Sequence, residues 1–182
     1  MPRVLILFAH PSLEKSRVHA KLVKNVPDHP DITFHDLYEA YPDYNIDVDR
    51  EQQLLIDHDI IVSQHPFFWY SIPPLLKQWI DLVLEHGWAY GSEGKALVGK
   101  SALSLISTGG GASAYTENGH NRFTIDQFLA PIEQTWVLCG VKFMPPYTIH
   151  GSLLMTTADI EEAARAYHNK LLSMATGQED SR

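Results

Sequence analysis

Three short segments concentrate the residues of this chain that could do chemistry. Residues 10–17 read HPSLEKSR and combine serine hydroxyls with basic side chains. Residues 65–74 read HPFFWYSIPP and hold four consecutive aromatic residues, and residues 108–115 read TGGGASAY. Hydroxyls and cations bind phosphate, aromatic faces bind flat rings, and glycines let the backbone approach a ligand. If the fold brings the segments together, they form a site for a planar, phosphorylated molecule.

The first segment has the composition of a phosphate-binding loop at the start of a helix. Ser16 suits an N-cap position, and Ser12 adds a second hydroxyl. Lys15, Arg17 and His19 form a local positive cluster in a chain of net charge −8, which favours an anion near a helix N-terminus. The segment lacks the GxxxxGK[ST] pattern of a P-loop. A capped helix with a solvated basic face would read similarly, so this segment alone leaves both interpretations open.

The aromatic and glycine segments are each ambiguous when taken alone. Phe67, Phe68, Trp69 and Tyr70 could form the wall of a ring-binding site, or a hydrophobic patch at a subunit interface. The run 109–111 could present backbone N–H groups to a ligand, or it could be a flexible connection. Only their common position in a fold can decide between these interpretations.

Tyr115 and His120 follow the glycine segment and are candidate proton donors. Either side chain could donate a proton or a hydrogen bond to a carbonyl oxygen that gains charge during reduction. Single tyrosines and histidines are more often structural, so the presence of Tyr115 and His120 at these positions does not by itself assign them this role.

The hydrophobic pattern predicts an α/β fold in which strands alternate with helices. Right-handed crossovers then give a flavodoxin-like three-layer sandwich, a five-stranded parallel sheet of order 2-1-3-4-5 with helices on both faces. Pro145-Pro146 predicts an edge strand or bulge, and Gly87 a helix C-terminal cap. We expect strands at residues 4–9, 32–35, 59–63, 102–107 and 141–149, and helices starting after Ser16 and Asp47, over 75–84 and 124–139, and from Thr156.

The predicted fold places the three segments at one edge of the sheet. They follow the first, third and fourth strands, and ligands of such sheets bind outside the carboxyl ends of the strands. A phosphate pocket, an aromatic wall and a glycine floor would then suit a flavin mononucleotide (FMN), with a second planar molecule stacked on its exposed ring.

Bulk composition limits the remaining classes of function. The 182 residues predict one domain, 1–176, with a disordered tail at 177–182. The net charge of −8 without a basic run argues against nucleic acid and anionic lipid as partners. One cysteine, Cys139, allows no intrachain disulfide and fits a cytoplasmic setting. The ten scattered histidines show no metal-ligand pattern, so no metal site is expected.

The segments LFAHP, YPDYNID, QHPFFWYSIPPLLKQWIDLVLEHGWAYG and STGGGASAY resemble the flavodoxin-like NAD(P)H:quinone oxidoreductase family. The similarity runs from about Val4 to Leu172 and is strongest to a bacterial branch, the ancillary proteins of glutathione-regulated potassium-efflux systems. It implies FMN, with FAD as the alternative, in a homodimer. It also implies a ping-pong reaction in which NAD(P)H passes a hydride to the flavin and a quinone then receives two electrons.

The resemblance also assigns roles to individual residues. Tyr115 and His120 resemble a tyrosine and a histidine that assist hydride transfer, although their separation is one residue shorter here. Phe68 stands where relatives often carry glutamine. The other expected cofactor contacts are His10, Ser16, Arg17, Val18 and His19 around the phosphate and ribityl chain, Phe67, Phe68, Trp69 and Tyr70 at the ring, and Ser107, Thr108, Gly109 and Gly110 at its polar edge.

Proteins of the efflux branch activate a potassium-efflux antiporter. The resemblance therefore implies peripheral attachment to the cytoplasmic face of the inner membrane and, as the alternative function, a mainly non-catalytic regulatory subunit. A one-electron flavodoxin carrier is disfavoured, because HPSLEKSR is longer and more basic than the phosphate loop of that class. A phosphoacceptor receiver domain is rejected, because His10 and His65 stand where its acids would be needed.

Overall fold

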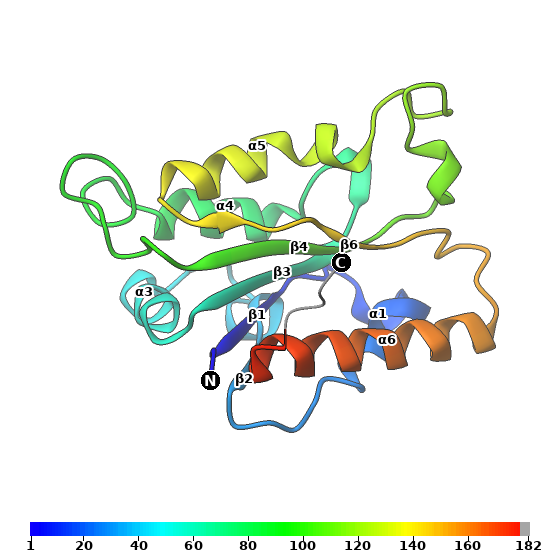
Figure 1. The fold of residues 1–182 in the computed structure, drawn as a ribbon, viewed down its shortest axis with the longest axis horizontal. Coiled ribbons are helices and arrows are strands. Elements are labelled where there is room, and N and C mark those ends of the chain that lie inside the picture. Colours follow the sequence, from blue (N-terminus) through cyan, green and yellow to red (C-terminus); the bar gives the residue numbers. More distant parts are fainter. Residues whose placement is uncertain (179–182) are drawn as a thin grey trace.

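The protein is built on a parallel sheet of six strands in a computed structural model that describes residues 1–178 (Figure 1). The order is β2-β1-β3-β4-β5, with β6 also paired to β4. This confirms the predicted flavodoxin-like order. Of the tail predicted at 177–182, residues 179–182 lie outside the described residues. The strands are β1 (Val4–Phe8), β2 (Ile32–Asp36), β3 (Ile60–Pro66), β4 (Ser101–Ser107), β5 (Lys142–Phe143) and β6 (Tyr147–Ile149).

The predicted fifth strand is divided into two short strands by Pro145-Pro146. β5 pairs with the start of β4, at Ser101 and Ala102. β6 pairs with its end, from Leu105 to Ser107. Proline has no N–H to donate to a strand ladder, so the pair interrupts hydrogen bonding without moving the chain away from β4. The interruption carries the chain on to the carboxyl edge of the sheet.

Helices cover both faces of the sheet, as Figure 1 shows: α1 and α6 lie on one side and α3, α4 and α5 on the other. The central strands are buried because their side chains point alternately into two hydrophobic cores, one on each face of the sheet. Leu5 and Leu7 belong to the core under α4, whereas Val4 and Ile6 belong to the core under α6. The helices are α1 (Arg17–Val23), α2 (Leu37–Ala40), α3 (Val48–Asp57), α4 (Pro74–Val83), α5 (Ile125–Leu138) and α6 (Thr157–Thr176), with the 3-10 turns η1 (Leu13–Lys15), η2 (Phe68–Tyr70) and η3 (Ala112–Ala114).

The helix starts follow from local capping, whereas one predicted helix end is wrong. The side chains of Ser16, Asp47, Thr124 and Thr156 each accept a backbone N–H as N-caps. Helix α4 ends at Val83, not at Gly87, because Leu84 leaves helical geometry with ψ 69° and turns into the core. Gly87, with φ 83°, instead forms the following turn.

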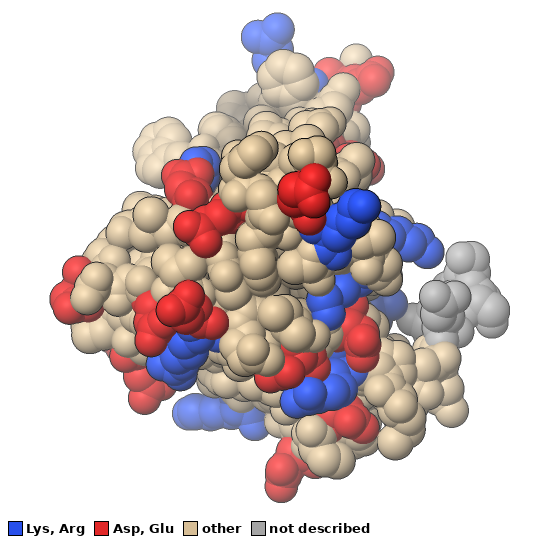
Figure 2. All heavy atoms as spheres, turned by 90° about the vertical axis from the view of Figure 1, so that its left-hand side faces the viewer, with Lys and Arg blue, Asp and Glu red and all other residues tan. Residues whose placement is uncertain are grey.

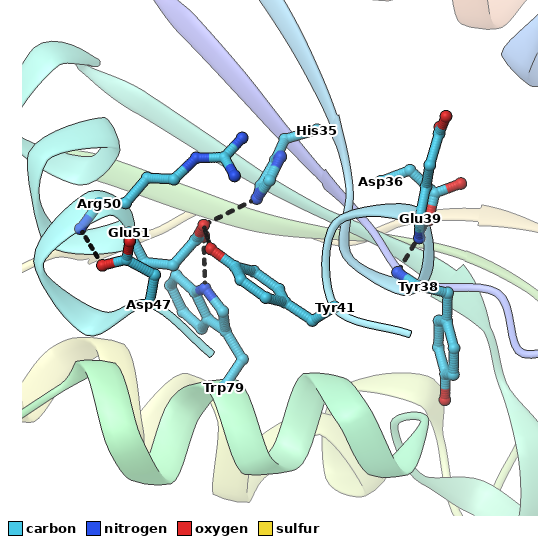
Figure 3. Close-up of polar contacts among 9 residues, drawn as sticks. All are labelled: His35, Asp36, Tyr38, Glu39, Tyr41, Asp47, Arg50, Glu51 and Trp79. Atoms are coloured by element: carbon cyan, nitrogen blue, oxygen red, sulfur yellow. Dashed lines mark hydrogen bonds and ion pairs between the residues drawn. The ribbon is translucent and has the colours of Figure 1, made fainter. Parts of the chain in front are cut away.

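A buried carboxylate ties four elements together on the α4 face of the sheet. Figure 3 shows His35, Tyr41 and Trp79 converging on Glu51 of α3. Glu51 Oε1 accepts hydrogen bonds from His35 Nε2 at 2.9 Å and from the Tyr41 hydroxyl at 2.5 Å, and its Oε2 accepts one from Trp79 Nε1 at 2.8 Å. Burial alone would raise the pKa of Glu51, but these hydrogen bonds lower it overall. The network fixes the YPDYNID segment against the sheet.

Charge is mixed on the face at the amino ends of the strands. Figure 2 views this face and shows acidic and basic side chains next to one another, without a continuous patch of either sign. Among residues 1–178, no helix is both long enough and apolar enough to cross a bilayer.

Candidate functional site

Direct hydrogen bonds join the three predicted loops at the carboxyl edge of the sheet. Phe67 N–H, which opens the aromatic loop, donates to Ser107 O at the end of β4, over 2.9 Å. His19 of α1 contacts the same serine, with 2.9 Å between Nε2 and the Ser107 hydroxyl. The end of β1 is bound to β3 through Ala9 N–H and Gln64 O, also at 2.9 Å. The three segments that the sequence analysis singled out therefore meet around Ser107.

The first loop presents backbone donors rather than a long helix dipole. Its turn η1 precedes Ser16, whose hydroxyl oxygen accepts His19 N–H at 3.0 Å. Helix α1 has only seven residues, so its dipole adds little. The N–H groups of Arg17 and Val18 make no hydrogen bond within residues 1–178. The Arg17 guanidinium donates to Met155 O at 3.1 Å, which fixes this cation beside the loop, while the Val18 side chain is buried in the core.

Three buried histidines, one of them the first residue of this loop, are neutral near pH 7. Burial, with a smaller contribution from His10 and His65, lowers the pKa of His19 to about 3. Burial lowers the pKa of His65 to about 4 and also lowers that of His10. His10 Nδ1 accepts Ser12 N–H at 3.1 Å, so a neutral His10 carries its proton on Nε2. His19 Nδ1 is buried without a partner. The cluster supplies hydrogen-bonding groups, not positive charge.

The aromatic loop is strained and presents its side chains to solvent. Trp69 and Tyr70 have φ of 50° and 64°, the left-handed region that costs bulky residues about 1–2 kcal/mol each. Tyr70 is held by a stacked contact with Phe128 at 4.9 Å and by a hydrogen bond from its hydroxyl to Asn121 Oδ1 at 3.2 Å. Phe67 is buried, but Phe68, Trp69 and Tyr70 are 50%, 91% and 45% exposed. The loop therefore combines a fixed backbone with one freely exposed ring, the indole of Trp69.

The strained turn also leaves three backbone donors unpaired. The N–H groups of Phe68, Trp69 and Tyr70 make no hydrogen bond to any described residue, although Ser71 N–H closes the turn on Phe68 O at 3.1 Å. Such an arrangement can hold the edge of a ligand through the backbone while a side chain covers its face.

Thr108, predicted as a cofactor contact, has all its polar groups occupied inside the protein. Its N–H donates to Ile149 O and its carbonyl accepts Ser152 N–H, both at 2.9 Å. Its hydroxyl donates to Gly110 O at 2.8 Å and lies 3.0 Å from His150 Nδ1. Thr108 is fully buried and can shape the glycine loop without touching a ligand through a polar group.

The glycine loop itself offers unpaired amides in a crowded setting. Within the described residues, the N–H groups of Gly109, Gly110 and Gly111 make no hydrogen bonds. A Cβ at Gly109 would lie 3.1 Å from Leu153 Cδ1, tighter than ordinary contact, whereas one at Gly110 would lie 3.7 Å from the Tyr115 hydroxyl. The loop is thus closely packed at Gly109, and its three N–H groups are available to a ligand.

The structure brings Tyr115 to the glycine loop but gives His120 no contact there. The Tyr115 ring lies 6.2 Å from Phe67 and 5.6 Å from His150, measured between ring centroids. His120 is exposed, and within residues 1–178 it makes no hydrogen bond or ring contact. Geometry therefore supports Tyr115 as part of the site, while the role of His120 stays a prediction.

His150 is a site residue that the sequence analysis missed. It follows β6 directly, at the same sheet edge as the three predicted loops, and contacts both Thr108 and Tyr115. The pattern placed a strand end at Ile149, so the rule that ligands bind past carboxyl ends could have indicated this position. It was overlooked because the fifth strand carries no glycine or aromatic run at that point.

The donors present fit FMN. Its phosphate and its ring carbonyl oxygens need hydrogen-bond donors, and the ring needs an apolar face. The described residues hold no group of three or more His, Cys, Asp or Glu side chains that could bind a metal ion. The unpaired donors that surround the sheet edge are the N–H groups of Arg17, Val18, Phe68, Trp69, Tyr70, Gly109, Gly110 and Gly111.

Known proteins share both the sequence and the fold of this chain. An uncharacterized NAD(P)H oxidoreductase, YrkL, of Bacillus subtilis is 44% identical over 162 residues, which are 89% of this chain and 93% of the relative. The structure of general stress protein 14 from Treponema denticola, in complex with FMN, is 39% identical with a TM-score of 0.87. That similarity covers 97% of this chain and 99% of the other.

Two further solved structures carry different names on the same fold. An NADPH-quinone reductase from P. pentosaceus is 29% identical with a TM-score of 0.83, covering 93% of this chain and 97% of that one. A thermophilic tryptophan halogenase from Streptomycin violaceusniger is 41% identical with a TM-score of 0.89, covering 92% and 98%.

A sequence model of the flavodoxin-like fold family matches residues 2–171, almost the whole described chain. This match agrees with the sheet order and with the three loops at its carboxyl edge. The chain therefore belongs to the flavodoxin-like family whose members include NAD(P)H oxidoreductases and quinone reductases.

Proposed function

We propose that this protein is an FMN-dependent NAD(P)H:quinone oxidoreductase. The observation that carries the proposal is the set of unpaired backbone donors on three loops, which meet around Ser107 beside an exposed aromatic surface. The names of the relatives supply the reaction class: NAD(P)H oxidoreductase, NADPH-quinone reductase and a complex with FMN. When bound, FMN supplies hydride transfer from NAD(P)H and two-electron transfer to a quinone, in the ping-pong order expected from the sequence.

Each loop has a distinct part in this proposal. The Arg17 and Val18 amides, the Ser16 hydroxyl and His10 hold the phosphate, with His19 behind them. The aromatic loop binds one edge of the ring through its backbone and covers a face with Trp69. The glycine-loop amides bind the polar edge of the ring.

Tyr115 stabilises charge at the reacting end of the site. Its hydroxyl lies beside the Gly110 backbone and is therefore placed to donate a hydrogen bond to an oxygen that becomes negative during reduction. His120 would assist as a proton donor only if its loop moves toward Tyr115 or another copy of the chain.

We also propose a homodimer with the exposed aromatic loop at the subunit interface. Phe68, Trp69 and Tyr70 together expose a contiguous apolar surface of the kind that marks protein interfaces, and a second copy would cover it. Analytical ultracentrifugation tests this directly, because Trp69→Ala should raise the dimer dissociation constant at least tenfold, whereas an unchanged constant would contradict it.

The role as an ancillary activator of a potassium-efflux antiporter at the membrane is a separate proposal and rests on the sequence resemblance alone. Co-purification with an antiporter would support it. Absence of that complex, in a protein that still reduces quinones, would leave the reductase as the whole function.

The name tryptophan halogenase describes a different reaction on the same fold, and folds host many functions. The reductase is preferred because two relatives carry names of that class. A tryptophan halogenation assay run beside the quinone assay would reverse this preference if only the former gave product.

The deciding experiment is the visible absorption spectrum of the protein mixed with FMN, before and after anaerobic NADH or NADPH. We expect a bound flavin that bleaches and then recovers when a benzoquinone is added. Trp69→Ala should weaken FMN binding by about tenfold, the equivalent of ~1.4 kcal/mol. Leu138→Ala, which removes an exposed apolar side chain on α5, is the matched control. Flavin retention in Trp69→Ala equal to that of the wild type would remove Trp69 from the site.

A further inference from the structure

His150 lies at the centre of a contact set that joins the glycine loop to the residues after β6. Its Nδ1 lies 3.0 Å from the Thr108 hydroxyl oxygen, and its ring lies 5.6 Å from that of Tyr115. The Thr108 hydroxyl donates in turn to Gly110 O at 2.8 Å, and Gly151 N–H donates to the same oxygen at 2.9 Å.

The contacts favour a proton on one particular nitrogen of His150. A hydroxyl has one proton, and that of Thr108 points to Gly110 O, which can only accept. With that proton on Gly110 O, the Thr108 oxygen is left to accept a hydrogen bond from His150 Nδ1–H. Burial lowers the pKa of His150, so the neutral imidazole with a bare Nε2 is the form present near pH 7.

The hydrogen bonds from His150 to Thr108 and from Thr108 to Gly110 O also orient the glycine loop. With both the Thr108 hydroxyl and Gly151 N–H on Gly110 O, the carbonyl is fixed toward the interior. In a trans peptide the C=O and the following N–H point in opposite directions. The Gly111 N–H, which has no partner among the described residues, is thereby directed away from β6. Loss of the hydrogen bonds to Gly110 O would let the Gly110–Gly111 peptide rotate, and the Gly111 N–H would no longer point in a fixed direction.

We propose that His150 is a positioning residue for the site: its Nδ1–H orders the Thr108 hydroxyl and the Gly110 carbonyl, and its ring supports Tyr115. It acts through the loop and does not itself need to touch the ligand. The proposal deepens the proposed function and rests on it. It explains why Thr108, fully buried with every polar group occupied, stands within the loop that presents the amides.

The first test reads the tautomer without any cofactor. In long-range ¹H–¹⁵N NMR spectra of the cofactor-free protein at pH 7.5, the imidazole signals that disappear in His150→Asn belong to His150. We expect a protonated Nδ1 and a bare Nε2. A protonated Nε2 with a bare Nδ1 would contradict the proposed hydrogen bond from His150 Nδ1–H to the Thr108 oxygen.

The second test measures FMN affinity in matched variants. His150→Ala should bind FMN about five- to tenfold more weakly, as expected for the loss of one buried hydrogen bond that orders others. His150→Asn, whose side-chain amide can place an N–H near the position of Nδ1, should recover affinity to within about twofold. Thr108→Val removes the next link and should match His150→Ala, and the double variant should be no weaker than either single one.

His168→Ala is the control, because His168 is also partly buried and hydrogen-bonded through Nδ1 but lies on α6 away from the loop. It should bind FMN as the wild type does. Wild-type affinity in His150→Ala, failure of His150→Asn to recover it, or additive losses in the double variant would each overturn the proposal. If the wild type itself binds no FMN, the proposed function fails, while the NMR result still decides the tautomer.

Discussion

At the scale of single residues, Glu51 shows how one side chain can fix a long connection. It is fully buried and accepts three hydrogen bonds from three different elements. Glu51→Gln keeps the size but replaces one acceptor oxygen by an N–H₂ group that faces donors. We expect the free energy of unfolding to fall by about 2–4 kcal/mol, as for other buried, charged hydrogen-bonded groups. Urea unfolding followed by circular dichroism measures the loss.

The control for Glu51 is Glu162→Gln on the exposed face of α6, which should change stability by less than about 0.5 kcal/mol. Equal effects of the two substitutions would show that the three hydrogen bonds to Glu51 contribute nothing specific.

Residue roles could be predicted from the sequence where they depend on near neighbours. Ser16 and Asp47 were recognisable as caps, since an N-cap is satisfied within three residues, and helix starts were predicted near Thr124 and Thr156, which the structure shows to be N-caps. The partners of Glu51 lie up to 28 residues away, at Trp79, and no local pattern indicates them. His150 was missed for the same reason, because its contact with Thr108 spans 42 residues.

At the scale of elements, the aromatic loop stores backbone strain that the sequence does not reveal. Trp69 has φ 50°, which glycine adopts freely and alanine does not. We therefore expect Trp69→Gly to be about 1 kcal/mol more stable to unfolding than Trp69→Ala, although both lose the same exposed indole. Thermal unfolding of the two cofactor-free variants measures the difference.

The comparison of these two variants has an internal control at a position with ordinary geometry. Leu138 lies in the last turn of helix α5, so Leu138→Gly should instead be less stable than Leu138→Ala by about 1 kcal/mol. The same order at both positions would mean that the left-handed turn relaxes when the indole is removed.

The order of elements could be predicted because hydrophobic periodicity is local, but their ends depend on packing. β3 continues past the predicted Ser63 to Pro66, since Gln64 and His65 are tolerated in the buried sheet. α4 stops before Gly87 because the core draws in Leu84. The Tyr167 hydroxyl of α6 donates to Gln64 Oε1 at 2.8 Å, over 103 residues of separation, which a reading of neighbouring residues cannot foresee.

At the scale of the whole molecule, the parallel sheet explains why the site could be located before its geometry was known. Parallel strands end at one edge, so loops that are distant in sequence must meet there. The topology does not predict the hydrogen-bond pattern, which leaves some loop N–H groups unpaired and gives every polar group of Thr108 a partner inside the protein. That pattern depends on the exact turn of each loop, which in Trp69 and Tyr70 departs from the usual backbone conformations.

Buried neutral histidines also make the stability of the whole molecule depend on pH. Burial lowers the pKa of His65 from 6.5 to about 4, and that of His19 to about 3. Between pH 6.5 and 4 the unfolded chain therefore binds protons that the folded chain does not, so stability falls as the pH falls through this window. Each group contributes at most about 1.4 kcal/mol per pH unit.

His65→Asn removes one such group but keeps a side-chain N–H for Pro66 O, which His65 Nδ1 contacts at 3.0 Å. Urea unfolding at several pH values should thus show a shallower loss of stability in His65→Asn than in the wild type, whatever the change at pH 7. Leu138→Ala, which removes no titratable group, should keep the wild-type slope. A His65→Asn slope equal to that of the wild type would mean that His65 becomes protonated in the folded protein without opening the sheet edge that carries the site.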